Sequence, residues 1–212
     1  MLNIAIVLYE RLTALDAVGP YEVLRGLPDS SLRFVATEPG PQRTDHGALA
    51  LVADHSIDDV SDVDIVVVPG GPGEVQARED QRLLEWLRAV DATSTWTTSV
   101  CTGSLVLGAA GLLKGKRATS HWTALEDLRT FGAEPSEERV VFDGKIVTAA
   151  GVSSGIDMAL TLVGKIAGDT VAQAIQLAIE YDPQPPHDAG STSKAPPEIV
   201  ELLRKNSRFF RD

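Results

Sequence analysis

The chain has 212 residues, of which 43% are hydrophobic and 23% are charged. This size and composition are typical of one globular domain with a sizeable core. The net charge of −11 disfavours binding to nucleic acid or to an anionic membrane, because such surfaces need clustered Lys and Arg. A single cysteine excludes an intrachain disulfide and a Cys-rich metal site, and it is typical of a reducing, cytoplasmic setting.

The chain opens with an apolar run at residues 2–8, which predicts a central parallel strand rather than a signal peptide. No apolar run approaches the roughly 18 residues that a membrane span needs. A helix is expected over residues 17–25, with Pro20 in its first turn. Asp16 lies between these elements. It is either a helix cap or a catalytic carboxylate, since α/β proteins bind ligands at the carboxyl edge of their sheet.

A strand is expected over residues 32–37, a short strand or hairpin arm over residues 48–52, and an acidic loop with one helical turn over residues 54–62. A buried strand over residues 64–69 and an amphipathic helix over residues 80–92 follow. Gly70 and Gly71 directly follow the buried strand. Their spacing matches neither a phosphate loop nor a dinucleotide-binding loop. They therefore form either a tight turn or a loop whose bare amides approach a reacting centre.

Cys101 lies between a predicted strand, residues 95–100, and a predicted buried helix, residues 105–113. Small residues stand two positions before it (Ser99) and two positions after it (Gly103), which is the spacing of a nucleophile elbow. A thiol at that turn points to the start of the next helix, which favours the thiolate. The alternative is a buried structural cysteine, because free cysteines are among the most buried residues.

Farther along, a helix is expected over residues 124–131, with Ser120 as its cap and His121 near its start. A lone histidine is more often structural than catalytic. A hairpin with its turn at Asp143-Gly144 is expected over residues 139–148, and a helix capped by Ser153 or Ser154 over residues 156–166. A second amphipathic helix is expected over residues 169–181, a Pro-rich connector over residues 182–197 and a last helix over residues 197–205.

Strands and helices alternate along the chain. This order predicts the α/β class, with a mostly parallel sheet and helices on both faces. One domain is expected over residues 1–212, including the connector and the last helix.

Three pieces of sequence carry a family resemblance: Leu15 to Val23 (LDAVGPYEV), Val68 to Gly71 (VPGG), and Ser99 to Ser104 (SVCTGS) followed by Ala118 to Trp122 (ATSHW). Together they resemble the ThiJ/PfpI superfamily, whose fold is class I glutamine amidotransferase-like, and within it the isonitrile hydratase group. The resemblance covers residues 2 to about 190. It implies a flavodoxin-like three-layer sandwich and a homodimer.

The chain departs from other branches of the superfamily. Amidotransferases complete a triad with a late His-x-Glu pair, which this sequence lacks, and proteases have a histidine where Thr102 stands. The chaperone and deglycase branch carries a glutamate where this chain has Asp16. The transcription-regulator branch continues into a DNA-binding region, whereas this chain stops at Asp212.

The resemblance implies that Cys101, Asp16 and Thr102 are the catalytic residues. Cys101 would attack the terminal carbon of an isonitrile and form a thioimidate. Asp16 would supply a proton and then activate water, which releases an N-substituted formamide.

The remaining site residues have supporting roles. The substrate-binding residues are expected to be Gly70, Gly71, His121 and Trp122, with His121 shaping the pocket. The amides of Gly71 and Thr102 are expected to stabilise developing charge, and the Thr102 hydroxyl to donate to Asp16 or substrate. The expected partner is a small-molecule substrate, without a metal or cofactor.

Three alternatives remain open at this point. A glyoxalase or deglycase of the same superfamily would form a hemithioacetal at Cys101. A redox sensor or holdase would oxidise Cys101 readily. A ligand-sensing module would bind small molecules without turnover.

Overall fold

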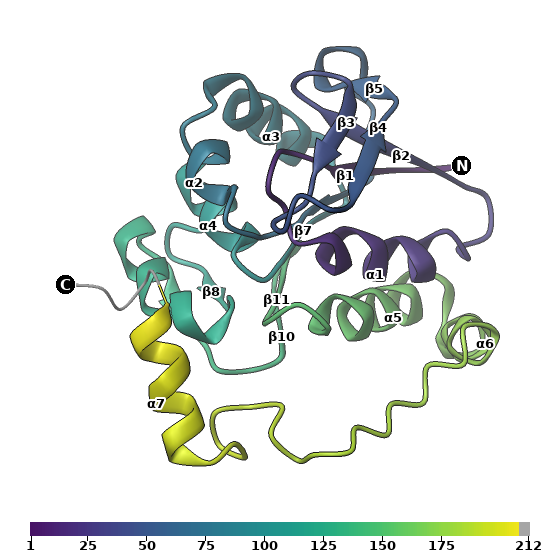
Figure 1. Cartoon of the computed structure of the whole chain (residues 1–212). Coiled ribbons are helices and arrows are strands. Elements are labelled where there is room, and N and C mark those ends of the chain that lie inside the picture. Colours follow the sequence, from purple (N-terminus) through teal and green to yellow (C-terminus); the bar gives the residue numbers. More distant parts are fainter. Residues whose placement is uncertain (208–212) are drawn as a thin grey trace.

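A computed structural model describes residues 1–207. Its central sheet has seven strands in the order β10-β11-β7-β6-β1-β2-β5, and only the β10–β11 pair is antiparallel (Figure 1). In chain order these strands are β1 (Leu2–Val7), β2 (Ser30–Ala36), β5 (His55–Ser56), β6 (Ile65–Val68), β7 (Trp96–Val100), β10 (Val140–Asp143) and β11 (Ile146–Ala149). This sheet confirms the predicted α/β class.

The remaining described elements surround this sheet. Two small sheets pair β3 (Gly40–Arg43) with β4 (Ala50–Ala53), and β8 (Arg117–Ala118) with β9 (Glu134–Pro135). The α-helices are α1 (Ala14–Leu24), α2 (Glu74–Ala77), α3 (Gln81–Thr93), α4 (Gly103–Ala109), α5 (Ser154–Ala167), α6 (Asp169–Ala178) and α7 (Pro197–Asn206). Three short 3₁₀ helices are η1 (Ile57–Asp59), η2 (Trp122–Ala124) and η3 (Glu126–Phe131).

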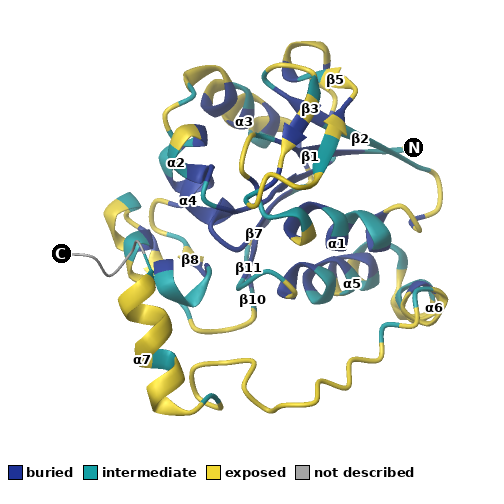
Figure 2. Ribbon diagram, in the orientation of Figure 1, coloured by how far each residue is buried: buried dark blue, intermediate teal, exposed yellow. Residues whose placement is uncertain are grey.

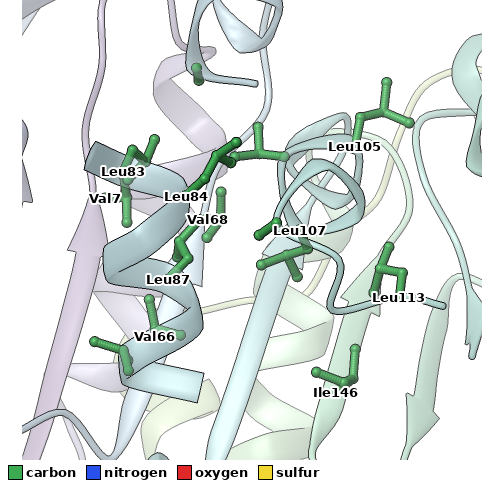
Figure 3. Packing of buried hydrophobic residues seen from close by; sticks show 14 of the residues in the cluster. Val7, Val66, Val68, Leu83, Leu84, Leu87, Leu105, Leu107, Leu113 and Ile146 are labelled. Carbon is green, nitrogen blue, oxygen red and sulfur yellow. The ribbon is translucent and has the colours of Figure 1, made fainter. Parts of the chain in front are cut away.

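Both faces of the sheet are buried, because side chains along a strand point alternately to opposite faces. In β1, Ala5 and Val7 pack with α3 and α4, whereas Ile4 and Ile6 pack with α1 and α5. Figure 3 shows the first of these cores, where leucines of α3 lie against Val66 and Val68 of β6. The three-layer arrangement explains why β6 is apolar at every position and β1 at every position except Asn3.

The C-terminal part of the described chain is much less buried. After α6 the chain crosses the outside of the molecule and ends in α7, and nearly all of this path is exposed (Figure 2). The predicted connector and last helix therefore exist, but α7 has no buried residue. The last five residues of the predicted domain, 208–212, lie outside the described residues.

Helix α1 begins earlier than predicted. It starts at Ala14, so Pro20 lies inside the helix rather than in its first turn. Pro20 is buried and contacts the position of Gly155 in α5, where an added Cβ would lie 3.2 Å from its ring. Close packing between α1 and α5 thus outweighs the usual preference of proline for a helix start.

Three other local predictions were wrong. Helix α4 covers Gly103–Ala109 rather than residues 105–113, and the segment after His121 is 3₁₀ rather than α-helical. The turn of the β10–β11 hairpin is Gly144-Lys145, one residue later than predicted. The elements β3, β5 and α2 were not predicted, because each has only two to four residues and too little periodicity to detect.

The sheet order places the site. From β1 the chain first adds β2 on one side and later adds β6 and β7 on the other. In α/β proteins this change of direction leaves a crevice at the carboxyl ends of the neighbouring strands. Asp16, Gly70 and Cys101 follow β1, β6 and β7 respectively, so the topology brings all three to one edge.

Candidate active site

Asp16 is fully buried in the first turn of α1, and its side chain points across the sheet edge. Its Oδ2 accepts a hydrogen bond of 2.9 Å from the amide of Gly70. Thr13 occupies the cap position of α1, so Asp16 is not the helix cap. Its Oδ1 is buried and has no partner in standard hydrogen-bond geometry.

Cys101 has the strained backbone of a nucleophile elbow. Its φ is 57°, in the left-handed region that residues other than glycine rarely adopt. The backbone amide donates to the carbonyls of Ala149 (3.0 Å) and Ala150 (2.8 Å). The carbonyl accepts hydrogen bonds of 3.1 Å from the hydroxyls of both Ser104 and Ser120. These bonds hold the strained turn, as expected where strain persists at a functional site.

The glycines around the elbow permit a very close approach of backbones. A Cβ at Gly103 would lie 2.1 Å from the carbonyl oxygen of Val68, and one at Gly70 would lie 2.5 Å from the amide nitrogen of Thr102. Both distances are far below van der Waals contact. The elbow therefore requires glycine at these positions for lack of space.

Thr102 binds the neighbouring glycine loop rather than Asp16. Its hydroxyl accepts from the Gly71 amide at 3.0 Å and lies 3.4 Å from the Gly71 carbonyl. This arrangement corrects two expectations. The Thr102 hydroxyl does not donate to Asp16, and the Gly71 amide is already used. Gly70 and Gly71 thus hold Asp16 and Thr102 in place through their amides.

The thiol of Cys101 interacts with the carboxyl of Asp16. Burial raises the pKa of Asp16 to about 7, although the hydrogen bond from Gly70 opposes the rise. Burial also raises the pKa of the Cys101 thiol, and the negative charge of Asp16 raises it further. Hydrogen bonds from the amides of Thr102 and Val152 oppose this rise. Burial and the charge of Asp16 both favour the protonated thiol over the expected thiolate. Helix α4 opposes them only weakly, because it has seven residues.

A cavity of about 470 Å³ adjoins this pair. Ser120 and Val152 line it, and both interact with Cys101. Cys101 itself is 5% exposed and lies behind this wall. The other lining residues come from loops and from the C-terminal segment: Thr119, His121, Trp122, Leu125, Glu137, Arg139, Ala150, Gly151, Ser153, Gly190, Ser191, Thr192, Ser193 and Arg204.

His121 and Trp122 line the cavity, and their rings lie 5.9 Å apart. His121 Nδ1 lies 2.7 Å from the Thr123 hydroxyl and accepts from the Thr123 amide, so His121 caps η2. Burial lowers the pKa of His121, which favours the neutral ring. Ser120, the predicted cap, instead holds the Cys101 carbonyl.

Several contributors to the site were not predicted from the sequence. The amide of Val152 faces the thiol, and Arg139 and Arg204 line the cavity. Ser153 occupies the cap position of α5 without capping it, and its Oγ accepts from Arg139 at 3.2 Å. The small-residue run 149–155 after β11 was the available signal, because it marks a fourth loop at the same sheet edge.

Within residues 1–207, no group of three or more His, Cys, Asp or Glu side chains is placed to hold a metal ion. In the same described part, no helix is long and apolar enough to cross a membrane. The arrangement that the site does contain is a buried thiol next to a buried carboxyl whose pKa is raised to about 7, beside a cavity. Such a pair can add a thiol to an electrophile and move the proton.

Comparisons with known proteins agree with this description. Residues 2–165 match the model of the DJ-1/PfpI family. An isonitrile hydratase of Pseudomonas putida is 44% identical over 97% of this chain and 90% of its own length. A crystal structure of a ThiJ/PfpI family protein from Pseudomonas syringae is 39% identical, with a TM-score of 0.93 over 96% of this chain and 85% of that one. DJ-1 homolog A of Arabidopsis thaliana is 32% identical over 81% of this chain and 44% of its own length.

Proposed function

The chain belongs to the DJ-1/PfpI family, and we propose that it hydrates isonitriles to N-substituted formamides. The similarity to an isonitrile hydratase over nearly the whole chain supports this reaction. The single observation in the structure that carries the proposal is the buried contact between the Cys101 thiol and the Asp16 carboxyl. In this reaction the sulfur and the proton of the thiol both add to the terminal carbon of the isonitrile. A protonated thiol next to a base suits such an addition.

The shape of the substrate fits the shape of the site. The reacting carbon of an isonitrile is terminal and carries no group besides the nitrogen, so it can approach a thiol that is little exposed. Cys101 is 5% exposed and lies behind the cavity wall formed by Ser120 and Val152. The carbon reaches the thiol while the N-substituent stays in the cavity of about 470 Å³.

In the first step, Asp16 as carboxylate takes the thiol proton while sulfur bonds to the terminal carbon. Asp16 then gives that proton to the carbon, which yields the thioimidate R–N=CH–S bound to Cys101. The pKa of Asp16, raised to about 7, suits both transfers near neutral pH. The amides of Thr102 and Val152 face the sulfur and stabilise charge that develops on it.

In the second step, Asp16 removes a proton from water, which attacks the thioimidate carbon. Asp16 passes this proton to the nitrogen, the C–S bond breaks, and the proton of the added hydroxyl goes to the sulfur. The product is R–NH–CHO, and the thiol is restored. Thr102 acts as a positioning residue, because its hydroxyl holds the Gly70-Gly71 loop that binds Asp16.

The test is product analysis by mass spectrometry after incubation of the purified protein with a panel of aliphatic and aromatic isonitriles. Wild-type protein should form the N-formamides, and Cys101→Ala should form none. If wild type and Cys101→Ala are equally inert across the panel, the proposal is wrong. Asp16→Asn adds a second readout: a protein mass increase equal to the isonitrile in this variant would show that the thioimidate forms without Asp16, contrary to the first step.

The same samples separate the alternatives. Lactate formed from methylglyoxal would indicate a glyoxalase, and ready oxidation of Cys101 by mild peroxide without turnover would indicate a redox sensor. Binding of isonitriles without any product would indicate a ligand-sensing module. Each outcome has its own product or protein mass.

We propose a cytoplasmic homodimer as the form in which the protein acts. The single cysteine, a free thiol, supports a reducing compartment. Large apolar side chains exposed on α1 and β4 support a self-complementary contact: Leu15 is 41% exposed and Val52 is 52% exposed. Sedimentation velocity tests the assembly, and a monomer at micromolar concentration would contradict it.

A further inference from the structure

The C-terminal segment, residues 182–206, is called the strap below. It consists of the Pro-rich connector and α7, and it crosses the outside of the molecule (Figure 1). None of its residues is buried. Several of its contacts are internal, such as the ion pair of 2.8 Å between Lys194 and Asp188. The strap therefore gains little stability from apolar burial, and its position depends on a few specific contacts with the body.

The first contact lies where the strap begins. Tyr181, the residue before it, hydrogen-bonds to Asp157 and Arg139. Arg139 in turn forms an ion pair with Asp157 and donates to Ser153 at 3.2 Å. This network joins the start of the strap to α5. Arg139 and Ser153 also line the cavity, so the network forms one end of the cavity wall.

The second contact lies on α7. The guanidinium of Arg204 stacks over the ring of Trp122, 5.9 Å from its centroid. Both side chains line the same cavity. Between the two contacts, Gly190 to Ser193 of the strap complete the wall. The strap thus closes over one cavity and is held near both of its ends by residues that line that cavity.

We propose that the strap is the outer wall of the pocket for the N-substituent, and that Trp122 and Arg204 determine which isonitriles are accepted. This inference rests on the proposed function. It assigns a specificity role to two lining residues outside the Cys101–Asp16 pair. Neither residue takes part in the proton transfers.

The lining indicates the class of substituent. Trp122, Leu125 and Val152 provide apolar surface, and hydroxyl groups such as that of Ser191 surround it. Arg139 is paired with Asp157, Arg204 is stacked on Trp122 and Glu137 is exposed, so the charged lining groups are already paired or solvated. The pocket therefore suits a neutral, bulky group, either aromatic or alicyclic. A volume of about 470 Å³ lies within the usual range for small-molecule pockets.

The experiment compares kcat/KM for benzyl isocyanide and methyl isocyanide, because only the first substituent is large enough to reach the strap. The measured quantity is the ratio of the two values. Arg204→Ala should lower this ratio about fivefold, through loss of the cation–π contact that holds α7. Trp122→Ala should lower it roughly tenfold or more, through loss of apolar contact with the ring. Lys205→Ala is the matched control, since Lys205 pairs with Glu201 on the same helix.

A general folding defect lowers both rates and leaves the ratio constant, so the ratio distinguishes specificity from stability. A ratio that stays within twofold of wild type in both active variants overturns the inference, and so does an equal fall in the Lys205→Ala control. In that case the proposed function still stands, because wild type remains active. If wild type hydrates neither isonitrile, the proposed function itself fails and the inference fails with it.

Discussion

The elbow and the strap are two walls of one site, and they are built in opposite ways. Around the elbow, Asp16, Thr102 and Cys101 are all buried, and their backbone and side-chain groups are tied by hydrogen bonds between four loops. The strap has no buried residue and depends on contacts near its two ends. Figure 2 shows this contrast as a dark core beside an exposed C-terminal segment.

The difference reflects what each wall does. Proton transfer between Asp16 and Cys101 needs fixed geometry and a low local dielectric, which a rigid interior supplies. Admission of a substrate needs a wall that opens at low cost, and exposed segments with few buried contacts open most easily. We therefore expect substitutions at the elbow to have large effects and matched substitutions in the strap to have small ones.

The largest effect is expected for Asp16→Asn. An amide cannot take up the thiol proton, so turnover of isonitriles should fall about 10²–10⁴-fold. Asp188→Asn removes an exposed carboxyl of the strap, which pairs with Lys194, and should leave turnover within about twofold of wild type. Steady-state kinetics with circular dichroism spectra measures both. Full turnover by a folded Asp16→Asn protein would remove Asp16 from the mechanism.

The same substitution should stabilise the fold at high pH. Burial raises the pKa of Asp16 from 3.8 to about 7, so the folded protein binds a proton more tightly than the unfolded chain. The free energy of unfolding of wild type therefore falls as the pH rises from about 4 to about 7, relative to Asp16→Asn. At pH 8 the variant should be more stable by up to about 4 kcal/mol. Urea denaturation at pH 5 and pH 8 tests this, and an equal gap at both pH values contradicts it.

The next largest effect is expected when a side chain is added at a closely packed glycine. A Cβ at Gly103 would lie 2.1 Å from the carbonyl oxygen of Val68, so Gly103→Ala should destabilise the fold by about 3 kcal/mol. Gly190 in the strap has nothing within 4 Å of an added Cβ. Gly190→Ala should therefore change stability by less than about 0.5 kcal/mol. Thermal unfolding measures the stability of the two variants. If the elbow loops relax freely, the two substitutions will have equal effects on stability, which would contradict this prediction.

The smallest effect is expected for Ser120→Ala, which removes one of two hydroxyl donors to the carbonyl of Cys101. We expect a loss of about 1 kcal/mol in stability. We also expect a several-fold fall in kcat, since the strained elbow is held less firmly. Ser193→Ala in the strap removes a hydroxyl whose partner is the exposed Ser191, and should change stability by much less. Equal effects from the two serines would falsify the view that the elbow is held by its hydrogen bonds.

The long elements and the positions of the candidate residues could be predicted from the sequence. The apolar runs of β1 and β6, the β-branched run of β7 and the small residues around Cys101 are local patterns, and local patterns depend on nearby residues alone. The alternation of these elements predicts the parallel sheet, and the sheet places Asp16, Gly70 and Cys101 at one edge. The short elements β5 and α2 were missed because two to four residues carry no periodicity.

Only the tertiary structure decided how these residues interact. Thr102 binds Gly71 rather than Asp16, and burial keeps the thiol protonated, because both properties depend on groups that are distant in sequence. The meeting of Trp122 and Arg204 across the cavity likewise depends on where the strap lies. The sequence by itself determined which chemical groups reach the sheet edge. The packing around them determined their charge, their partners and the shape of the pocket, because desolvation and contact exist only in the folded chain.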